Sequence, residues 1–235
     1  MIKFNEKVEV FMNIIGKIKT DFPEKFGLPR QSGLISELRG EIIFEKEYAN
    51  PEAIRGLLEY SHIWILWEFS EAKREKWSPT VRPPRLGGET RMGVFATRSP
   101  FRPNPIGLSV VKLEKIEMRK KEGPVLIVSG IDMMDGTPIY DIKPYLPHID
   151  AIGEAKCGFA ERVKDYSLEV VFENECDKEL LPECINALKK VLSQDPRPSY
   201  QDDPKRIYGM LYNGYNVKFY VNNGVVYINK VEKIK

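Results

Sequence analysis

The amino-acid sequence predicts a mainly β protein that ends in a small α+β unit. Runs rich in β-branched and aromatic residues recur over the first part of the chain, and glycine or proline separates them. These runs do not alternate with helical patterns, as the strands of a parallel sheet do. Past about Asp150 an apolar pattern with helical spacing appears, followed by hairpin signals. We therefore predict two domains, a β domain over residues 1–155 and a small α+β domain over residues 156–235.

The first elements are predicted in order along the chain. Residues 8–19 are rich in β-branched side chains and predict a strand, and a loop with two prolines and two glycines follows at 20–33. A short strand is predicted at 40–44. The Asn-Pro-Glu sequence at 50–52 predicts the start of a short helix, because Asn caps, Pro suits the first turn and Glu suits the positive helix end. The almost continuous apolar run at 62–69 predicts a central strand.

The middle of the chain combines an irregular segment with further strands. Residues 78–107 contain six prolines and four glycines, so neither a helix nor a regular strand is predicted there. Strands are predicted at 106–118 and 125–131. Residues 133–137 contain Asp-Gly, which is a hairpin signal.

The C-terminal part predicts one helix packed with a few strands. Residues 167–172 alternate like a strand, and apolar residues between 180 and 192 recur at helical spacing. Three more strands are separated by Asn-Gly and Asn-Asn-Gly turns. They are predicted at 207–212, 217–221 and 225–228.

Composition excludes several protein classes. No apolar run approaches the ~20 residues of a membrane span, and the charged start is unlike a secretory signal. The three cysteines lack metal-type spacing and leave an odd count, and only two histidines occur. Glycine-rich dinucleotide loops, P-loops and GxSxG elbows are missing. We therefore expect a cytoplasmic protein with reduced thiols, no membrane contact and no metal.

The charge is unevenly spread along the chain. The formal net charge is +2, but the segment from Ala72 to Gly107 contains eight basic and two acidic residues, so it carries +6 and the remainder −4. A local basic stretch on a nearly neutral protein indicates an anionic partner, while a solvated charged face is the alternative.

The arginines of residues 80–107 stand among prolines. Proline fixes φ and removes backbone donors, so this segment is expected to be stiff. A guanidinium held by a stiff backbone loses less entropy when it grips a phosphate or carboxylate. Candidate phosphate contacts are Arg82, Arg85, Arg91 and Arg102, with Lys73 and Lys76 beside them. The alternative is that some of these arginines brace the barrel or the dimer. In that case Arg197, Lys205 and Arg206 are the next candidates for contacts to tRNA.

Several long motifs resemble one known family. TVRPPRLGG, RMGVFATRSPFRPNPIGLS, DGTPIYDIKPYLP and QDPRPSY are similar to the TsaA-like or TrmO family of tRNA (adenine-37) N6-methyltransferases, and FGLPRQSGL and SHIWILWEF fit the same pattern. The resemblance covers nearly the whole chain. It implies methyl transfer from S-adenosyl-L-methionine to N6 of threonylcarbamoyladenosine at position 37 of tRNA. It also implies a single-sheet antiparallel β-barrel, a homodimer, and the tRNA anticodon loop as partner.

The resemblance also implies a set of cofactor-binding residues. An acidic Asp132 suits the ammonium or ribose of the cofactor. Family members often carry His-Gln where this chain has Ser70-Glu71, so any contact there uses different groups. For Arg98 the alternative is a structural ion pair, and for Leu108 it is plain core packing. The implied cofactor contacts are Pro29, Arg30, Gln31, Ser70, Glu71, Arg98, Leu108, Ile131, Asp132 and Met133.

The acceptor side has its own candidates. An exocyclic amine is a weak nucleophile until acceptors polarise it and hold it in line with the methyl group. The chain has no Asn/Asp-Pro-Pro motif, but Asp195 offers an acceptor and Tyr200 a stacking face, which RNA bases favour. The alternative is a capping Asp and a packed Tyr. Strand alternation places Trp64 and Trp67 on opposite faces, which favours core packing over a stacking platform.

Two rival functions share these motifs. One is a barrel that binds an adenosine ligand or tRNA without catalysis, and the other is methylation of a different substrate.

His62 begins a buried strand and is expected to be a core histidine instead of a catalytic base.

Overall fold

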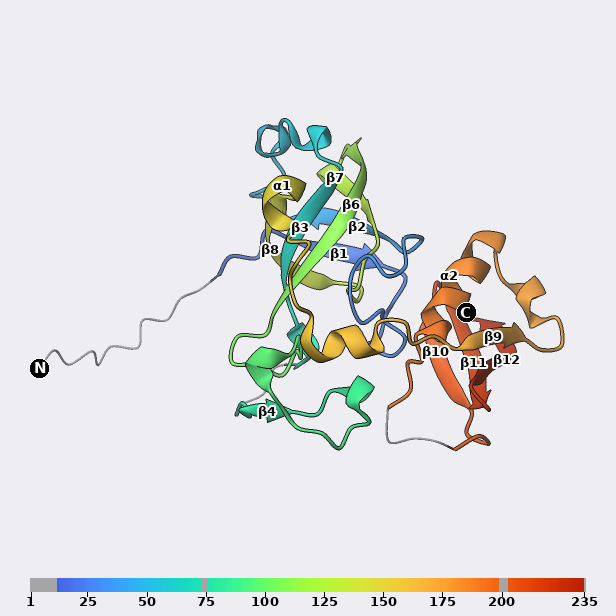
Figure 1. Cartoon of the computed structure of the whole chain (residues 1–235). Coiled ribbons are helices and arrows are strands. Elements are labelled where there is room, and N and C mark those ends of the chain that lie inside the picture. The colour runs from blue at the N-terminus through green and yellow to red at the C-terminus, as the bar shows by residue number, and fades with distance from the viewer. Residues whose placement is uncertain (1–11, 73–75, 199–202, 235) are drawn as a thin grey trace, which may run out of the picture.

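The structure is a computed structural model that describes residues 12–72, 76–198 and 203–234. Figure 1 shows a barrel in the centre and a smaller unit beside it that carries the C-terminus. The predicted strand residues 8–11, Lys73 and Tyr200 lie outside the described residues. None of the helices in the described ranges is long and apolar enough to cross a membrane.

The larger unit is a closed antiparallel barrel of six strands, in the order β1-β2-β7-β6-β3-β8. The prediction of a mainly β protein built on an antiparallel barrel is confirmed. β3 lies between β6 and β8, as expected for a central strand. The strands are β1 (Gly16–Thr20), β2 (Arg39–Phe44), β3 (His62–Glu68), β6 (Ile106–Arg119), β7 (Gly123–Ser129) and β8 (Thr137–Pro144).

The two tryptophans of β3 face opposite sides of the barrel wall, as predicted. Trp67 points inward with Ile63 and Ile65, and its side chain is buried. Trp64 is only half-buried, and its indole Nε1 donates to Asp150 Oδ2 at 3.0 Å. The inner face of β3 therefore forms barrel core.

The structure differs from the predicted elements at two barrel strands. β1 is shorter than predicted, because Met12, Asn13 and Ile14 are exposed. Ile15 still continues the pairing: its amide donates to Ile139 O at 2.8 Å and its backbone oxygen accepts from the Glu45 amide at 2.9 Å. The closing strand β8 was not predicted. Its prolines at both ends weaken the strand signal, although Pro138 is accommodated opposite Lys17.

The capped turn at 50–52 is confirmed, but it is a 3₁₀ helix, η1 (Pro51–Ile54). Asn50 Oδ1 accepts from the amide of Glu52 at 3.0 Å, so it satisfies one of the free donors at the helix start. A second 3₁₀ turn, η2 (Leu57–Glu59), leads into β3.

The arginine- and proline-rich segment between β3 and β6 lies at one end of the barrel (Figure 1). Its only sheet pairing in the described ranges joins two very short strands, so it is largely irregular, as the prolines predict. Its elements are η3 (Ser70–Ala72), β4 (Thr80–Val81), η4 (Pro84–Leu86), β5 (Met92–Gly93) and η5 (Val94–Ala96).

The C-terminal unit packs one helix on a four-stranded sheet of order β10-β11-β12-β9, in which β9 runs parallel to β12. The buried face of the helix carries Cys184, Leu188, Val191 and Leu192, as the helical spacing predicts. Two short helices, α1 (Pro147–Asp150) and η6 (Gly158–Val163), connect the barrel to this unit. Its elements are β9 (Glu169–Phe172), η7 (Cys176–Glu179), α2 (Pro182–Ser193), β10 (Tyr208–Tyr212), β11 (Tyr215–Asn222) and β12 (Val225–Lys233).

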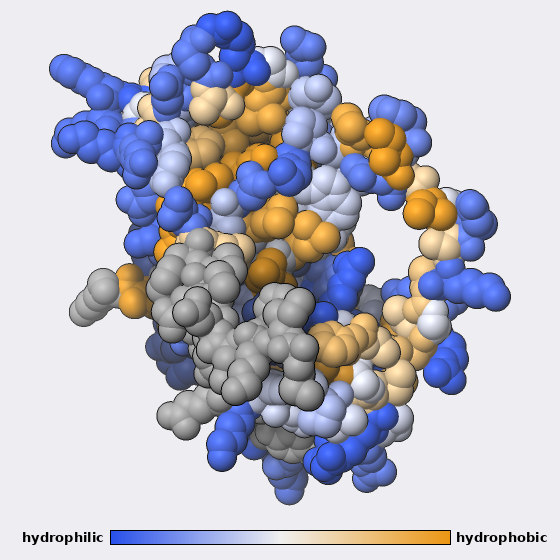
Figure 2. Space-filling view, turned by 90° about the vertical axis from the view of Figure 1, so that its left-hand side faces the viewer, coloured by the Kyte–Doolittle hydropathy of each residue, from blue (hydrophilic) through white to orange (hydrophobic). Residues whose placement is uncertain are grey.

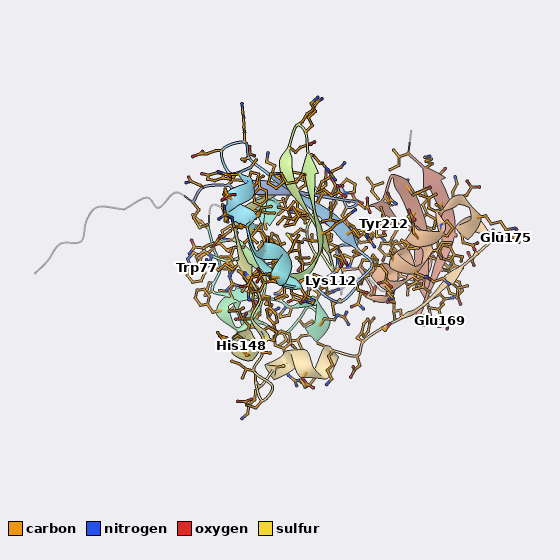
Figure 3. The ribbon with its side chains drawn as sticks, turned by 90° about the horizontal axis from the view of Figure 1, so that it is seen from above. Trp77, Lys112, His148, Glu169, Glu175 and Tyr212 are labelled. Carbon is orange, nitrogen blue, oxygen red and sulfur yellow. The ribbon has the colours of Figure 1, made fainter. Side chains whose placement is uncertain are left out.

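The loop after β1 packs the barrel against the C-terminal sheet. The Phe22 and Tyr212 rings lie 5.1 Å apart, and Phe26 stacks on Phe219 with centroids 6.1 Å apart. Figure 3 shows Tyr212 on the side of the C-terminal unit that faces the barrel. Gly27, with φ +92°, lies against Met210, leaving no room for a side chain. This packing fixes the last part of the loop, residues 29–33, at the junction. The domain boundary near residue 155 stays a prediction.

Candidate functional site

A hydrogen-bonded chain leads from the barrel interior to Asp132, which lies just beyond the end of β7. The Trp67 indole Nε1 donates to Ser109 Oγ at 2.9 Å, and Ser109 Oγ donates to Asp132 Oδ1 at 2.7 Å. Burial raises the pKa of the Asp132 carboxyl to about 6, although hydrogen bonds from Ser109 and Ser32 and the nearby Arg98 charge act in the opposite direction. The site thus holds a carboxylate that a cationic ligand would stabilise.

Two of the predicted cofactor residues meet beside this carboxylate. Arg98 Nη1 donates to Gln31 Oε1, and Gln31 Nε2 donates to the backbone oxygen of Arg30. Arg98 is exposed, and its charge acts on Asp132. The structure therefore brings together Gln31, Arg98 and Asp132 from three separate parts of the sequence.

The backbone around Gln31 is held against the end of β7. The Gly33 amide donates to Gly130 O at 2.8 Å, and both glycines have positive φ values, +78° and +77°. A β-carbon on Gly130 would stand 3.4 Å from Gly33 Cα, so the two chains approach closely. Ser32 Oγ also accepts from the Val110 amide at 3.1 Å. These bonds tie the loop to both β6 and β7.

Other predicted cofactor residues offer less to a ligand. The side chains of Ile131 and Met133 are fully buried in the core, and Pro29 is buried too, so only their backbone can face a ligand. Leu108 is 55% exposed, so it is not part of the core. It points out of the barrel, whereas Ser109 next to it points inward, so the Leu108 side chain does not join the Asp132 cluster.

Ser70 and Glu71 are not linked by a described hydrogen bond to the cluster around Asp132. Both are exposed in η3, and the backbone oxygen of Glu71 accepts from Lys25 Nζ. Among the residues that the structure describes, no hydrogen bond joins either of them to Gln31, Arg98 or Asp132.

Arg30 turns away from this cluster toward the C-terminal unit. Its Nη2 donates to the backbone oxygen of Asp195 at 3.1 Å. The Asp195 carboxylate accepts from Arg197 Nε at 2.8 Å and Nη2 at 3.0 Å, and from the Tyr166 hydroxyl at 2.8 Å. Asp195 follows α2 with a left-handed φ of +50°, and its amide donates to Leu192 O at 3.0 Å. It therefore anchors the junction and ends the helix.

The arginines of the 78–107 segment have different environments. Arg82 and Arg91 are exposed, and Arg91 Nη1 donates to Thr80 Oγ1 at 3.4 Å. Arg102 Nη1 donates to the backbone oxygens of Thr97 and Ser99, so it braces its own loop.

Arg85 instead reaches the C-terminal unit. Its guanidinium lies 4.4 Å from the centre of the Tyr166 ring, and it donates to Gln194 Oε1 at 3.3 Å. Sequence reasoning missed Tyr166 and Gln194, because these contacts cross 81 and 109 residues of sequence. It also missed Ser109, although strand alternation beside the exposed Leu108 is a signal for an inward residue.

Two family models match the chain. The tRNA-methyltransferase O N-terminal domain matches residues 17–151, and the TrmO C-terminal domain matches residues 165–234. The chain belongs to the TrmO family. The match to the N-terminal TrmO model covers the barrel, and the match to the C-terminal model covers the unit that contains Tyr166 and Asp195.

Individual TrmO relatives agree with this assignment. The chain is 41% identical to the tRNA (adenine(37)-N6)-methyltransferase of Escherichia coli, over 89% of this chain and 92% of that protein. It is also 41% identical to a Pseudomonas aeruginosa protein named as an S-adenosylmethionine-dependent methyltransferase, over 83% of this chain and 86% of that protein. A crystal structure of TrmO from P. aeruginosa matches with a TM-score of 0.79 and 33% identity, covering 97% of this chain and 99% of that one.

In the described ranges, no group of three or more His, Cys, Asp or Glu side chains is arranged to hold a metal ion. The hydrogen-bonding and charged side chains of the candidate site are those around Asp132.

Proposed function

We propose that this protein transfers a methyl group from S-adenosyl-L-methionine to N6 of adenosine 37 in tRNA, with threonylcarbamoyladenosine as the acceptor nucleoside. The observation that carries the proposal is a largely buried Asp132 carboxyl that feels the charge of Arg98, which is itself hydrogen-bonded to Gln31, on the barrel of a TrmO family member. The names of the relatives support the same reaction.

The cluster suits the chemistry of this cofactor. S-adenosyl-L-methionine carries an ammonium, a carboxylate and a cationic sulfonium, and it supplies an activated methyl group when bound. Asp132 offers the negative charge that an ammonium or a ribose hydroxyl needs, and Arg98 offers a positive charge for a carboxylate. The Gln31 amide and the backbone of Ile131 and Met133 complete the polar surface, and Leu108, on the outer face of β6, remains a candidate outside the cluster. Ser70 and Glu71 remain candidates at the edge of this site.

On the acceptor side, the proposal assigns Asp195 and Tyr200. The protein must hold the exocyclic amine in line with the methyl group and polarise it through an acceptor. Asp195 Oδ2 is such an acceptor, and the Tyr166 hydroxyl now donates to it at 2.8 Å. An amine that binds there would replace that hydroxyl. The backbone oxygen of Asp195 accepts from Arg30, and the backbone oxygen of Arg30 accepts from Gln31. Two hydrogen bonds therefore connect Asp195 with the cluster around Asp132.

The proposal includes a cytoplasmic homodimer. Figure 2 shows apolar side chains gathered on the barrel face that looks away from the C-terminal unit. Large exposed apolar patches on soluble proteins mark interaction surfaces. Strongly exposed apolar residues of the barrel and its loops include Leu58, Leu108, Met118, Ile149 and Ile152. Sedimentation at micromolar concentration would show a dimer mass, and a monomer mass would contradict this part.

One experiment separates the proposal from its rivals. Purified protein is incubated with methyl-labelled S-adenosyl-L-methionine and tRNA that carries threonylcarbamoyladenosine, and the nucleosides are analysed by mass spectrometry. We expect one methyl group on the N6 position of that nucleoside. Binding of both molecules without transfer would show a non-catalytic barrel, and methyl on another nucleoside would show a different substrate.

A further inference from the structure

Two arginines at the junction of the barrel and the C-terminal unit have no ion-pair partner among the residues that the structure describes. Arg30 and Arg85 are each half-buried, and within the described part of the chain each donates only to neutral oxygens. Arg30 donates to the backbone oxygen of Asp195, and Arg85 donates to the backbone and side-chain oxygens of Gln194 and to the backbone oxygen of Tyr166. Neither arginine forms an ion pair with a described residue.

This arrangement leaves excess positive charge at the junction. The carboxylate of Asp195, whose charge acts on both arginines, is held by Arg197 in a two-point ion pair and by the Tyr166 hydroxyl. Burial and the neighbouring Arg85 lower the pKa of Arg30, and burial lowers the pKa of Arg85, while Asp195 opposes both shifts. A partly buried cation without a counter-charge loses hydration without full compensation. An anion that enters the junction restores the balance.

We propose that Arg30 and Arg85 form an oxyanion site between the barrel and the C-terminal unit, and that its occupant is a backbone phosphate of the RNA substrate. This rests on the proposed function, because it is that function which makes RNA the substrate. Arginine forks match the tetrahedral oxygens of a phosphate, and they bind it in two-point geometry.

The surroundings favour a phosphate over the cofactor carboxylate. Arg85 lies against the ring of Tyr166, which is 43% exposed, so the site opens to solvent where a long polymer can pass. Arg85 also belongs to the +6 segment, whose exposed Arg82 and Arg91 extend the positive surface. Arg98 on the barrel already provides a positive charge beside Asp132 for the cofactor.

The site also links the two units to the reaction. Its arginines come from the barrel side, whereas Tyr166, Gln194 and Asp195 come from the C-terminal side. A phosphate bound to both guanidinium groups would therefore hold the RNA across the junction. Asp195 acts here as a positioning residue, because its backbone oxygen fixes the Arg30 guanidinium.

The test compares Arg85→Gln with Arg162→Gln in the full chain. Arg162 is exposed in η6 and provides a control for the loss of one surface charge. Affinity for tRNA is measured across a series of salt concentrations, and affinity for S-adenosyl-L-methionine and the melting temperature are measured alongside. We expect Arg85→Gln to weaken tRNA binding about tenfold or more, the range for losing a hydrogen bond to a charged group. We expect the salt slope to fall by about 0.7–0.9, one phosphate contact, with cofactor affinity unchanged.

Three results would overturn the inference. Arg85→Gln could match Arg162→Gln in tRNA affinity and slope. It could instead weaken cofactor binding alone, which would assign the oxyanion to the cofactor carboxylate. Arg85→Lys, which keeps the charge, should retain the wild-type slope, and a slope as low as that of Arg85→Gln would contradict a phosphate contact. If Arg85→Gln lowers the melting temperature, tRNA affinity and its salt slope are measured for Arg30→Gln instead. Methyl transfer by the wild type is assayed separately, so salt-dependent tRNA binding without transfer contradicts only the proposed function.

Discussion

At the scale of single residues, the carboxylate of Asp132 is the feature that ties the barrel to cofactor chemistry. Burial raises its pKa to about 6, so the carboxyl is protonated in a pH range where an ordinary aspartate is ionised. A neutral Asp132 no longer attracts an ammonium. We expect affinity for S-adenosyl-L-methionine to fall by about tenfold between pH 7 and pH 5, at the rate set by one titrating group. Calorimetric titrations across this range measure it.

The Asp132→Asn variant supplies the control. Its affinity for S-adenosyl-L-methionine should be lower than that of the wild type at pH 7 and should not change between pH 7 and pH 5.

The raised pKa of Asp132 also predicts how the stability of the fold changes with pH. A carboxyl whose pKa is higher in the folded state than in the unfolded chain favours folding at low pH, and this contribution is lost as the pH rises from about 4 through 6. Wild type should therefore lose stability relative to Asp132→Asn over this window in urea titrations. A constant difference between the two proteins would contradict a raised pKa.

At the scale of elements, one glycine of β6 makes room for the Trp67 ring of β3. Gly107 lies opposite Trp67, and a β-carbon there would stand 2.1 Å from the indole ring. We expect Gly107→Ala to destabilise the fold by about 1–3 kcal/mol, the usual range for overpacking a core. It should also disturb the bond from the indole to Ser109, which supports Asp132. Thermal unfolding and cofactor titration measure the two effects.

Gly93→Ala is the matched control for this substitution. Gly93 lies in the same stretch of sequence, with a negative φ of −56° and no atom within 4 Å of an added β-carbon. Its melting temperature should stay within the small range of surface substitutions. Equal effects of the two alanines would show that the glycines matter only through chain entropy.

How much was predictable from sequence also depends on the element. β3 and β6 are long runs with strong strand signals, so both were predicted almost to their ends. β8 was missed because its prolines oppose a strand, and tertiary closure of the barrel overrides that local preference. In the site, family motifs pointed to Gln31, Arg98 and Asp132. The partners of Arg85 were out of reach, since no local pattern joins residue 85 to residues 166 and 194.

At the scale of the whole molecule, the loop at 20–33 connects the proposed cofactor site with the C-terminal unit. One side of it carries Arg30 and Gln31, and the other packs Phe26 against Tyr208 and Phe219, with centroid distances of 6.3 and 6.1 Å. Tyr212 faces the same junction (Figure 3), and Trp77 and Glu175 lie at opposite ends of the molecule. The C-terminal unit thus positions the loop from outside the barrel.

This arrangement predicts that loosening the packing of Phe26 impairs tRNA binding and methylation but leaves cofactor binding intact. Phe26→Ala removes the stacked ring, so the C-terminal unit should lose its fixed place beside Arg30 and Asp195. We expect stability to fall by up to about 3–5 kcal/mol, the range for Phe→Ala in a core, with the lower end favoured because Phe26 is only partly buried. We also expect tRNA methylation to fall at least as far as tRNA affinity, while cofactor affinity stays near wild type, because Asp132 and Arg98 remain on the barrel. Leu34→Ala, at a 50% exposed position after the same loop, is the control and should change none of these values. If Phe26→Ala weakens cofactor and tRNA binding equally, then the loop transmits the disturbance to Gln31, and the barrel does not hold its cofactor site independently of the C-terminal unit.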